Sequence, residues 1–278
     1  MDNTKEPINA ISLCTGYGGI ELGLRNILPA MRTRAYCEIE SFVICSMGAK
    51  IEAGQMDEAP ICTSLAQFPF RKFRGVPNLL LTGGFPCTPF SGASGKRKST
   101  EDPRHLYPII SRGIEECQPS AIFLENVAGI ISAKTGDGES VLKYVLGDLE
   151  RLGFRAEAGI FSASEVGARH QRKRVFILAH SNSEGLEGWN SQSLCQRPIK
   201  LSTWQRSPQV SRPNERQHEW ESRRTISKSK LCGTTNGPRS GVDSTAHRVD
   251  RLRMLGNGCY PDQVAFAYYT LNKRFING

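Results

Sequence analysis

Residues 78–95 read NLLLTGGFPCTPFSGASG. The apolar run at 79–81 predicts a buried parallel strand, because it is short, continuous and closed by turn residues. A Gly-Gly pair then permits a sharp exit from the strand and a close approach by a ligand. Pro86 and Pro89 fix φ on both sides of Cys87, so a stiffened loop presents the thiol at the carboxyl end of the strand, where open α/β sheets bind ligands. Taken alone, this pattern fits a nucleophile and a small buried core residue equally well.

The composition limits the kinds of protein that this chain can be. The 278 residues carry a net charge of +9, which favours a polyanionic partner, either nucleic acid or an anionic membrane. No two of the nine cysteines have C-x-x-C spacing, so a reducing cytoplasm is expected, without zinc or disulfide frameworks. The first residues have no apolar core and no apolar run is long enough to span a bilayer, so neither a signal peptide nor a membrane span is expected. One domain, alone or with a small insert, accounts for the length.

A strand, a glycine-rich turn and a helix are predicted near the amino end. Residues 8–14 predict the strand, 15–19 (TGYGG) the turn, and 20–28 a helix that stops at Pro29. Such a unit forms a cradle for a nucleotide cofactor, because free N–H groups at the start of the helix attract a carboxylate or a phosphate. The spacing is G-x-G-G rather than G-x-G-x-x-G, so the loop alone is a weak signal.

An acid follows the next predicted strand, residues 34–37. Glu38 lies about 20 residues after the glycine loop, where a carboxylate can bind both hydroxyls of an adenosine ribose. The alternative is a solvated glutamate at the start of the helix that is predicted over 41–53. The distance from the loop favours Glu38 as the ribose ligand and Glu40 as a charge at the helix start.

Charged side chains flank two further predicted strands. Glu125 follows the apolar strand 121–124, where a carboxylate either hydrogen-bonds the amidine edge of a substrate or is simply solvated. Arg172 and Arg174 lead into the strand that begins at Val175, and alternation sends both to one face, where they need anions or acids unless they form an edge cluster. The other expected elements are a helix over 104–117, a helix over 141–152, a strand over 154–161, a turn at 256–258 and a helix over 264–271.

Two stretches lack the pattern of regular elements. Residues 92–103, with three cations in a row, fit a flap that closes over a phosphate backbone, or an ordinary solvated loop. Residues 181–247 are rich in Ser, Arg, Gln and Asn and contain all three tryptophans, which fits a DNA-contacting insert or a poorly ordered one. The chain is therefore expected to leave its core near residue 180 and to return near residue 248.

In this order the motifs resemble those of the DNA (cytosine-5) methyltransferases. The resemblance is carried by CTGYGG at 14–19, FPCTPFS at 85–91, ENV at 125–127, QRKR at 171–174 and GNG at 256–258. It implies S-adenosyl-L-methionine as the cofactor. The implied cofactor-binding residues are Cys14, Thr15, Gly16, Tyr17, Gly18, Gly19, Glu38, Ile39, Ser64, Pro86 and Asn257, and the implied catalytic residues are Cys87, Glu125, Arg172 and Arg174.

The resemblance also implies a role for each catalytic residue. Cys87 adds as a thiolate to carbon 6 of a cytosine that has been flipped out of the duplex, which activates carbon 5 for methylation. Glu125 hydrogen-bonds the N3 and amino edge of the base, and Arg172 contacts the carbonyl oxygen of the base. Arg174 braces Glu125 or a phosphate, and the flap closes behind the base.

The implied fold is α/β: a Rossmann-like S-adenosylmethionine-dependent methyltransferase sheet flanked by helices, with a small irregular target-recognition insert. Residues 1–180, completed by 248–278, form the catalytic domain, and 181–247 form the insert. The expected protein is a monomeric DNA (cytosine-5-)-methyltransferase that acts on double-stranded DNA, with no metal and no membrane partner. Its expected setting is the cytoplasm of a bacterial or phage-infected cell, as in a restriction-modification system.

Four residues depart from the family's usual pattern in the adenosine pocket. Ser12 replaces a common acid, Cys14 a Phe, Ile39 a Trp and Ser64 an Asp. The catalytic set is intact, so methylation of cytosine in DNA is the leading interpretation. Two alternatives stay open: a catalytically impaired relative that binds DNA, and the same chemistry on RNA.

Overall fold

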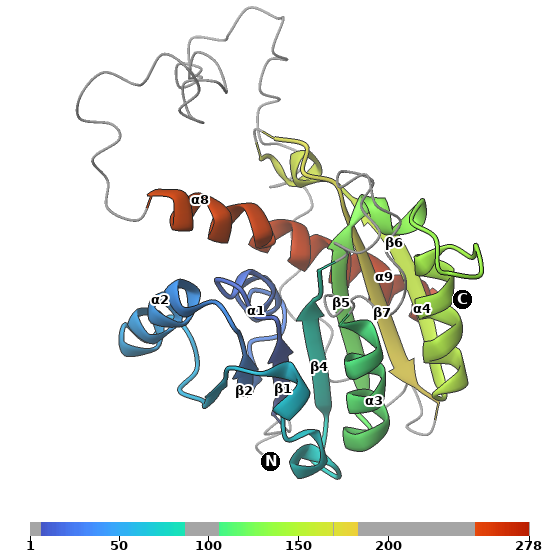
Figure 1. Cartoon of the computed structure of the whole chain (residues 1–278), viewed down its shortest axis with the longest axis horizontal. Coiled ribbons are helices and arrows are strands. Elements are labelled where there is room, and N and C mark those ends of the chain that lie inside the picture. The colour runs from blue at the N-terminus through green and yellow to red at the C-terminus, as the bar shows by residue number, and fades with distance from the viewer. Residues whose placement is uncertain (1–6, 87–105, 169, 183–247, 278) are drawn as a thin grey trace, which may run out of the picture.

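The computed structural model describes residues 7–86, 106–168, 170–182 and 248–277. The predictions for Cys87, for the flap at 92–103 and for all but the first two residues of the insert lie outside these ranges. Within them, a seven-stranded sheet is flanked by helices (Figure 1). The strands are β1 (Ile8–Leu13), β2 (Met31–Cys37), β3 (Ile61–Cys62), β4 (Leu79–Gly84), β5 (Ala121–Val127), β6 (Phe154–Phe161) and β7 (Arg174–Ser181).

The sheet has the strand order β3-β2-β1-β4-β5-β7-β6. Strands β1 to β5 pair in parallel, and β7 runs antiparallel to both β5 and β6. The predicted α/β class with a mostly parallel sheet is therefore confirmed. Strand β4 is buried along nearly its whole length, because helices cover both faces of the sheet.

The helices connect the strands and cover both faces. They are α1 (Gly19–Arg25), α2 (Ser41–Glu52), α3 (Tyr107–Cys117), α4 (Val141–Arg151), α8 (Arg248–Asn257) and α9 (Pro261–Asn277), with short 3₁₀ turns η1 (Leu65–Gln67), η2 (Phe70–Phe73), η4 (Ala128–Ile131) and η5 (Ala163–Val166). Helix α1 ends at Arg25, before the predicted end at Leu28, because the following residues form a separate turn ahead of Pro29. In the described part of the chain, no helix is both long and apolar enough to cross a membrane.

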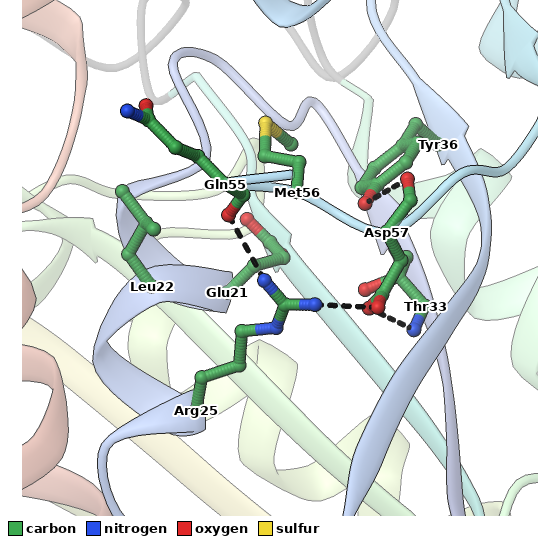
Figure 2. A pocket seen from close by; sticks show the side chains of 8 residues that line it. All are labelled: Glu21, Leu22, Arg25, Thr33, Tyr36, Gln55, Met56 and Asp57. Atoms are coloured by element: carbon green, nitrogen blue, oxygen red, sulfur yellow. Dashed lines mark hydrogen bonds and ion pairs between the residues drawn. The ribbon is translucent and has the colours of Figure 1, made fainter. Parts of the chain in front are cut away.

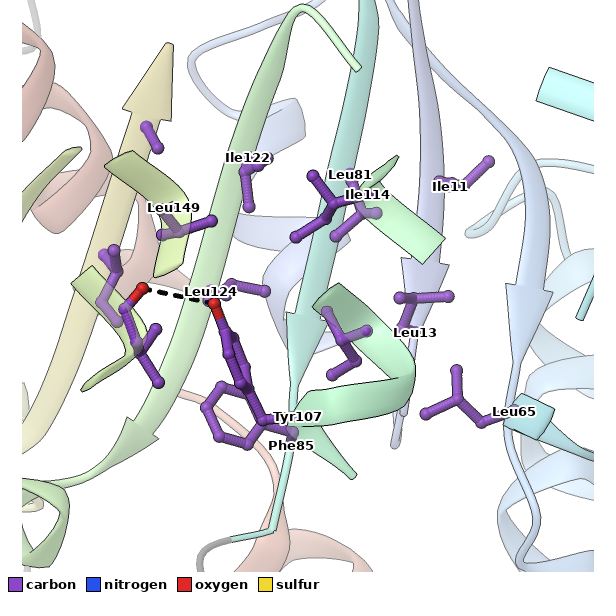
Figure 3. Close-up of a cluster of buried hydrophobic side chains, with 14 of the residues drawn as sticks. Ile11, Leu13, Leu65, Leu81, Phe85, Tyr107, Ile114, Ile122, Leu124 and Leu149 are labelled. Atoms are coloured by element: carbon purple, nitrogen blue, oxygen red, sulfur yellow. Dashed lines mark hydrogen bonds between the residues drawn. The ribbon is translucent and has the colours of Figure 1, made fainter. Parts of the chain in front are cut away.

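Alternation along the strands sends side chains into two apolar cores. Leu81 and Leu124 lie on one face, where they pack with α3 and α4 (Figure 3). Leu80 and Phe123 lie on the other face and pack with α1 and α9. The buried Tyr107 hydroxyl on α3 donates a hydrogen bond to a backbone carbonyl of α4 over 3.2 Å, which ties these two helices together. The result is a sheet held between two helical layers, with its strand ends free to carry a site.

Residues 248–277 return to this core as expected, but their local structure differs from the prediction. The turn predicted at 256–258 is wrong in part, because α8 continues to Asn257. No proline interrupts the helix before Pro261, and Arg172 binds carbonyl oxygens at the end of the helix. Helix α9 begins at Pro261, a favoured first helical residue, and runs past the predicted end at Leu271.

Gly113 on α3 tests the packing between that helix and η2. A β-carbon at Gly113 would lie 2.4 Å from the Phe70 ring, whereas a β-carbon at Gly147 on α4 meets nothing within 4 Å. Ala in place of a helical Gly stabilises by about 1 kcal/mol, while overpacking a core costs about 1–3 kcal/mol. We therefore expect Gly113→Ala to lower the free energy of unfolding in urea, and the matched control Gly147→Ala to raise it. Equal changes in the two variants would contradict the tight contact at Phe70.

Candidate active site

The candidate site lies at the carboxyl ends of β1, β2, β4 and β5. The chain steps from β1 to β2 on one side, and β4 pairs with β1 on the other side. The connections after β1 and β4 therefore leave in opposite directions, and open α/β sheets bind ligands where this reversal occurs. The structure brings the glycine loop 14–19, Glu38, Pro86 and Glu125 to this edge.

The glycine loop is tied to Glu38 by backbone hydrogen bonds. The Glu38 carboxylate accepts from the N–H groups of Gly16 (2.8 Å), Ile39 (2.8 Å) and Glu40 (2.9 Å). Gly16 has a φ of +59°, which glycine adopts without strain. A carboxylate has about four acceptor sites, so one remains on the buried Glu38 for a ribose hydroxyl.

A polar network lies beneath the loop. The Ser12 and Thr15 hydroxyls share a hydrogen bond of 2.9 Å. Glu21 on α1 reaches the same place, where its Oε1 accepts from the Thr82 hydroxyl (2.9 Å). Burial raises the pKa of the Glu21 carboxyl. An acid is thus present under the loop although the strand itself carries Ser12.

Figure 2 shows how the chain after α2 closes the underside of α1. Asp57 accepts from the Arg25 guanidinium (2.5 Å) and from the backbone N–H of Thr33 (2.7 Å), while the Tyr36 hydroxyl donates to the Asp57 carbonyl oxygen (3.1 Å). Glu21 lies beside these residues, which pack without room for a water molecule between them. These residues lie beneath α1 and connect it to β2, so they support the glycine loop at the start of α1.

Tyr17 connects the glycine loop to the α8–α9 joint, which we define as residues 255–260. The Tyr17 hydroxyl donates to the carbonyl oxygen of Cys259, and a β-carbon at Gly258 would collide with the Tyr17 ring. Lys50 on α2 donates to the Tyr17 carbonyl oxygen and lies 4.9 Å from the centroid of the ring. Two segments more than 230 residues apart therefore meet at this edge of the sheet.

Besides Gly16 and Tyr17, five of the predicted cofactor residues are exposed or half-buried. The exposed ones are Ile39, Pro86 and Asn257, and the half-buried ones are Cys14 and Ser64. Glu40 is the N-cap residue of α2, at the helix start as predicted; it makes no side-chain cap hydrogen bond, and its carboxylate pairs with Arg253 on α8 (2.6 Å). This ion pair fixes α8 against the end of β2.

Glu125 is the buried acid of the site. It lies within β5 rather than after it, because pairing with β7 continues to Val127. The Nε of Arg174 lies 2.8 Å from Oε1 of Glu125, so the two side chains form an ion pair. Burial raises the pKa of the Glu125 carboxyl to about 7, and Arg174, Cys259 and Arg172 oppose the rise. A group with this pKa can both hold and release a proton near neutrality.

Gly84 and Asn126 shape the surroundings of Glu125. A β-carbon at Gly84 would lie 3.1 Å from Oε2 of Glu125, so a larger residue there would press on the carboxylate. Asn126 Nδ2 donates to the carbonyl oxygen of Phe85 (2.9 Å), and its Oδ1 accepts from the next backbone N–H (2.9 Å). The ENV segment therefore holds the end of the chain that leads to Cys87.

Arg172 lies two residues before β7, with a φ of +35°, so strand alternation is not what brings it near Glu125. Its Nη2 donates to the carbonyl oxygens of Leu255 (3.1 Å), Gly256 (2.8 Å) and Gly258. Among the described residues, nothing accepts a hydrogen bond from its Nε. Contact with the carbonyl oxygen of a base stays a prediction, and it would have to use guanidinium nitrogens other than Nη2.

Sequence reasoning missed three residues of this region: Glu21, Lys50 and Cys259. The signal for Glu21 was an acid set among the apolar residues of a short helix. Cys259 follows the GNG motif directly and is buried against Glu125, which raises its pKa further. Lys50 left no signal, because a lysine on a surface helix is usually solvated.

A family model for C-5 cytosine-specific DNA methylases matches residues 8–264. The chain belongs to this family. Among its relatives, the Type II methyltransferase M.NgoMIV of Neisseria gonorrhoeae is 31% identical over 173 residues, which cover 62% of this chain and 52% of the relative. M.BanI of Aneurinibacillus aneurinilyticus is 30% identical over 177 residues, which cover 62% of this chain and 38% of the relative.

The match to these Type II methyltransferases is confined to part of each relative, since the chain spans about half of their length or less. Among solved structures, the Entamoeba histolytica methyltransferase EhMeth is similar, with 18% identity and a TM-score of 0.49 over 63% of this chain and 53% of that chain.

The raised pKa of Glu125 predicts a change of stability with pH. Between the ordinary value of 4.5 and about 7, the folded protein binds more protons at this carboxyl than the unfolded chain does. The contribution of Glu125 to the free energy of unfolding therefore falls as pH rises through this window and is constant above it. We expect Glu125→Gln to flatten the fall, by up to about 1.4 kcal/mol per pH unit, in urea denaturation across that range. Glu150→Gln, at an exposed acid on α4, is the control, and an equal effect of both variants would contradict the assignment.

Proposed function

We propose that this chain transfers a methyl group from S-adenosyl-L-methionine to carbon 5 of cytosine in DNA. The observation that carries the proposal is the ion pair between Glu125 on β5 and Arg174 on β7. Strand β5 pairs with β4, and β4 leads to Cys87. Addition of a thiolate to a pyrimidine needs a proton donor at the ring, and a carboxyl with a pKa of about 7 supplies one. Membership of the C-5 cytosine-specific DNA methylase family supports the same reaction.

The residues at the strand ends fit the cofactor. A β-carbon at Gly16 would meet nothing within 4 Å, so open space adjoins the Glu38 carboxylate, which keeps one acceptor site for a ribose hydroxyl. When bound, S-adenosyl-L-methionine supplies an electrophilic methyl group. We assign its binding to residues 14–19, Glu38, Ile39, Ser64, Pro86 and Asn257.

Cys87 begins the chemistry as a thiolate. Its sulfur forms a bond to carbon 6 of the flipped cytosine, the C5=C6 electron pair moves to C4=C5, and the C4=N3 pair moves onto N3, which takes the proton of Glu125. Arg174 then stabilises the ionised Glu125 carboxylate. The charge that forms on the protein is thus already paired.

Carbon 5, now nucleophilic, would bond to the methyl group as the bond from that methyl to the sulfonium sulfur of the donor breaks, with its electron pair left on sulfur in S-adenosylhomocysteine. The C4=N3 bond forms again. A solvent water molecule takes the proton from carbon 5, and the electron pair left behind forms C5=C6 again while the bond between sulfur and carbon 6 breaks with its electron pair on sulfur. N3 gives its proton back to Glu125. The Cys87 thiolate and the protonated carboxyl are both restored. Arg172 contributes by holding the α8–α9 joint beside Glu125.

We assign residues 1–180 with 248–278 to the catalytic domain and 181–247 to target recognition. The described parts of the first group support this division, since α9 packs against β6 and β7 in the same core. The proposed substrate is double-stranded DNA, whose target base must leave the stack to reach Glu125. The flap at 92–103 would close behind the base, and the chain would act as a monomer in the cytoplasm of a bacterial or phage-infected cell.

Transfer of labelled methyl groups from S-adenosyl-L-methionine to mixed-sequence duplex DNA tests the proposal. We expect the wild type to place the label in 5-methylcytosine and Cys87→Ala to give only background. Cys45→Ala, which changes an exposed cysteine on α2, is the matched control and should equal the wild type. Glu125→Gln should lower the rate by about 10²–10⁴-fold.

The same assay separates the alternatives. Methylation by Cys87→Ala at the wild-type rate would falsify its role as the nucleophile. Label in transfer RNA but not in DNA would assign the chemistry to RNA. DNA binding without label in either nucleic acid, and without binding of S-adenosylhomocysteine, would identify a catalytically impaired relative.

A further inference from the structure

Gln263 on α9 lies behind the candidate site and is completely buried. Its Nε2 donates to the carbonyl oxygen of Phe161 at the end of β6 (2.8 Å) and to the carbonyl oxygen of Arg172 (2.8 Å). A single side-chain amide therefore fixes two other chain segments to α9. Phe161 also pairs with Arg174 in the β6–β7 ladder, whereas Arg172 lies ahead of β7, so the Gln263 amide gives the Arg172 carbonyl a hydrogen bond that no strand ladder supplies.

The backbone of Arg172 needs such a restraint because its conformation is unfavourable. A φ of +35° is rare for a residue with a long side chain and persists only where the surroundings impose it. The preceding carbonyl, of Gln171, is held as well, by the N–H of Ala163 (2.8 Å) and the hydroxyl of Ser162 (2.6 Å). Gln263 completes this restraint on the side of α9.

The restrained backbone determines where the guanidinium of Arg172 goes. Its Nη2 donates to three carbonyl oxygens of the α8–α9 joint. The joint in turn contributes Cys259, which contacts the Glu125 carboxyl. Contacts thus run from Gln263 to Arg172, from Arg172 to the α8–α9 joint, and from the joint to Glu125.

We propose that Gln263 is a positioning residue, which fixes the backbone of Arg172 and so keeps its guanidinium on the α8–α9 joint beside Glu125. The proposal deepens the proposed function, since it rests on Glu125 as the acid of that reaction. A role limited to stability predicts a different outcome, because loss of the amide would then leave the surroundings of Glu125 unchanged.

Four ionisable groups from four segments face Glu125. They are Arg174 on β7, Arg172 ahead of β7, Cys259 in the α8–α9 joint and Tyr17 in the glycine loop. Of these, only Arg172 has a backbone that Gln263 holds. Release of Arg172 would withdraw a cation from Glu125, and the pKa of Glu125 should then rise further above its ordinary value.

The experiment is a ¹³C NMR titration of the Glu125 carboxyl in the full chain, with the signal assigned by its loss in Glu125→Gln. Gln263→Met keeps the length of the side chain and removes its donors. Asn272→Met, at another fully buried amide on α9, is the matched control. We expect the pKa of Glu125 to rise by about 0.5 unit or more in Gln263→Met and not in Asn272→Met.

A kinetic comparison accompanies the titration. In methyl transfer to DNA, kcat of Gln263→Met should fall by about tenfold or more, since small misplacements of a site cost this much, and kcat of Asn272→Met should not. An unchanged Glu125 pKa, or equal shifts in both variants, would overturn the proposal. Should Gln263→Met fail to fold, Gln263→Asn, which keeps an amide too short to reach both carbonyls, is judged by the same criteria.

The titration needs neither cofactor nor DNA, so it separates this proposal from the proposed function. A wild type without methyl transfer, together with a shifted Glu125 pKa in Gln263→Met, would refute the function and leave the positioning of Arg172 by Gln263 in place.

Discussion

The ion pair between Glu125 and Arg174 is the interaction on which the candidate site depends. A carboxylate at this depth is costly without a partner, and the guanidinium 2.8 Å away supplies one. Because β7 runs antiparallel to β5, Arg174 at the start of β7 lies opposite Val127 at the end of β5. Glu125 is two residues before Val127 and so lies on the same face of β5, within reach of Arg174. Burial and the nearby cations then compete, and the resulting pKa of about 7 allows one group to give and take a proton.

Around this pair, the chain joins segments from its two ends. Tyr17 and Arg172 both bind backbone carbonyls of the α8–α9 joint, and Arg253 on α8 pairs with Glu40 after β2. Helix α8 is the first element described after residue 182, and its carboxyl end lies at the candidate site. The glycine loop, Glu125 and the α8–α9 joint therefore lie together at one edge of the sheet.

The sequence predicted the elements whose signals are local. Apolar runs bounded by turn residues gave the strands from β1 to β7, with the short β3 as the exception, and apolar periodicity gave α3 and α4. Features that depend on distant partners could not be predicted in this way. The end of α8 at Asn257 depends on Arg172, the orientation of Glu40 depends on Arg253, and the position of Arg172 depends on Gln263. Each of these partners lies more than 80 residues away, and no local pattern carries such information.

A covalent bond between Cys87 and carbon 6 of cytosine is the step from which the proposed chemistry follows. Release of the enzyme requires loss of a proton from carbon 5, and fluorine at that carbon cannot leave as a cation. Duplex DNA with 5-fluorocytosine in place of cytosine should therefore trap the protein when S-adenosyl-L-methionine is present. We expect mass spectrometry to find protein bound covalently to DNA through the peptide that contains Cys87. Complexes without any covalent bond, from protein that methylates ordinary cytosine at carbon 5, would contradict the mechanism.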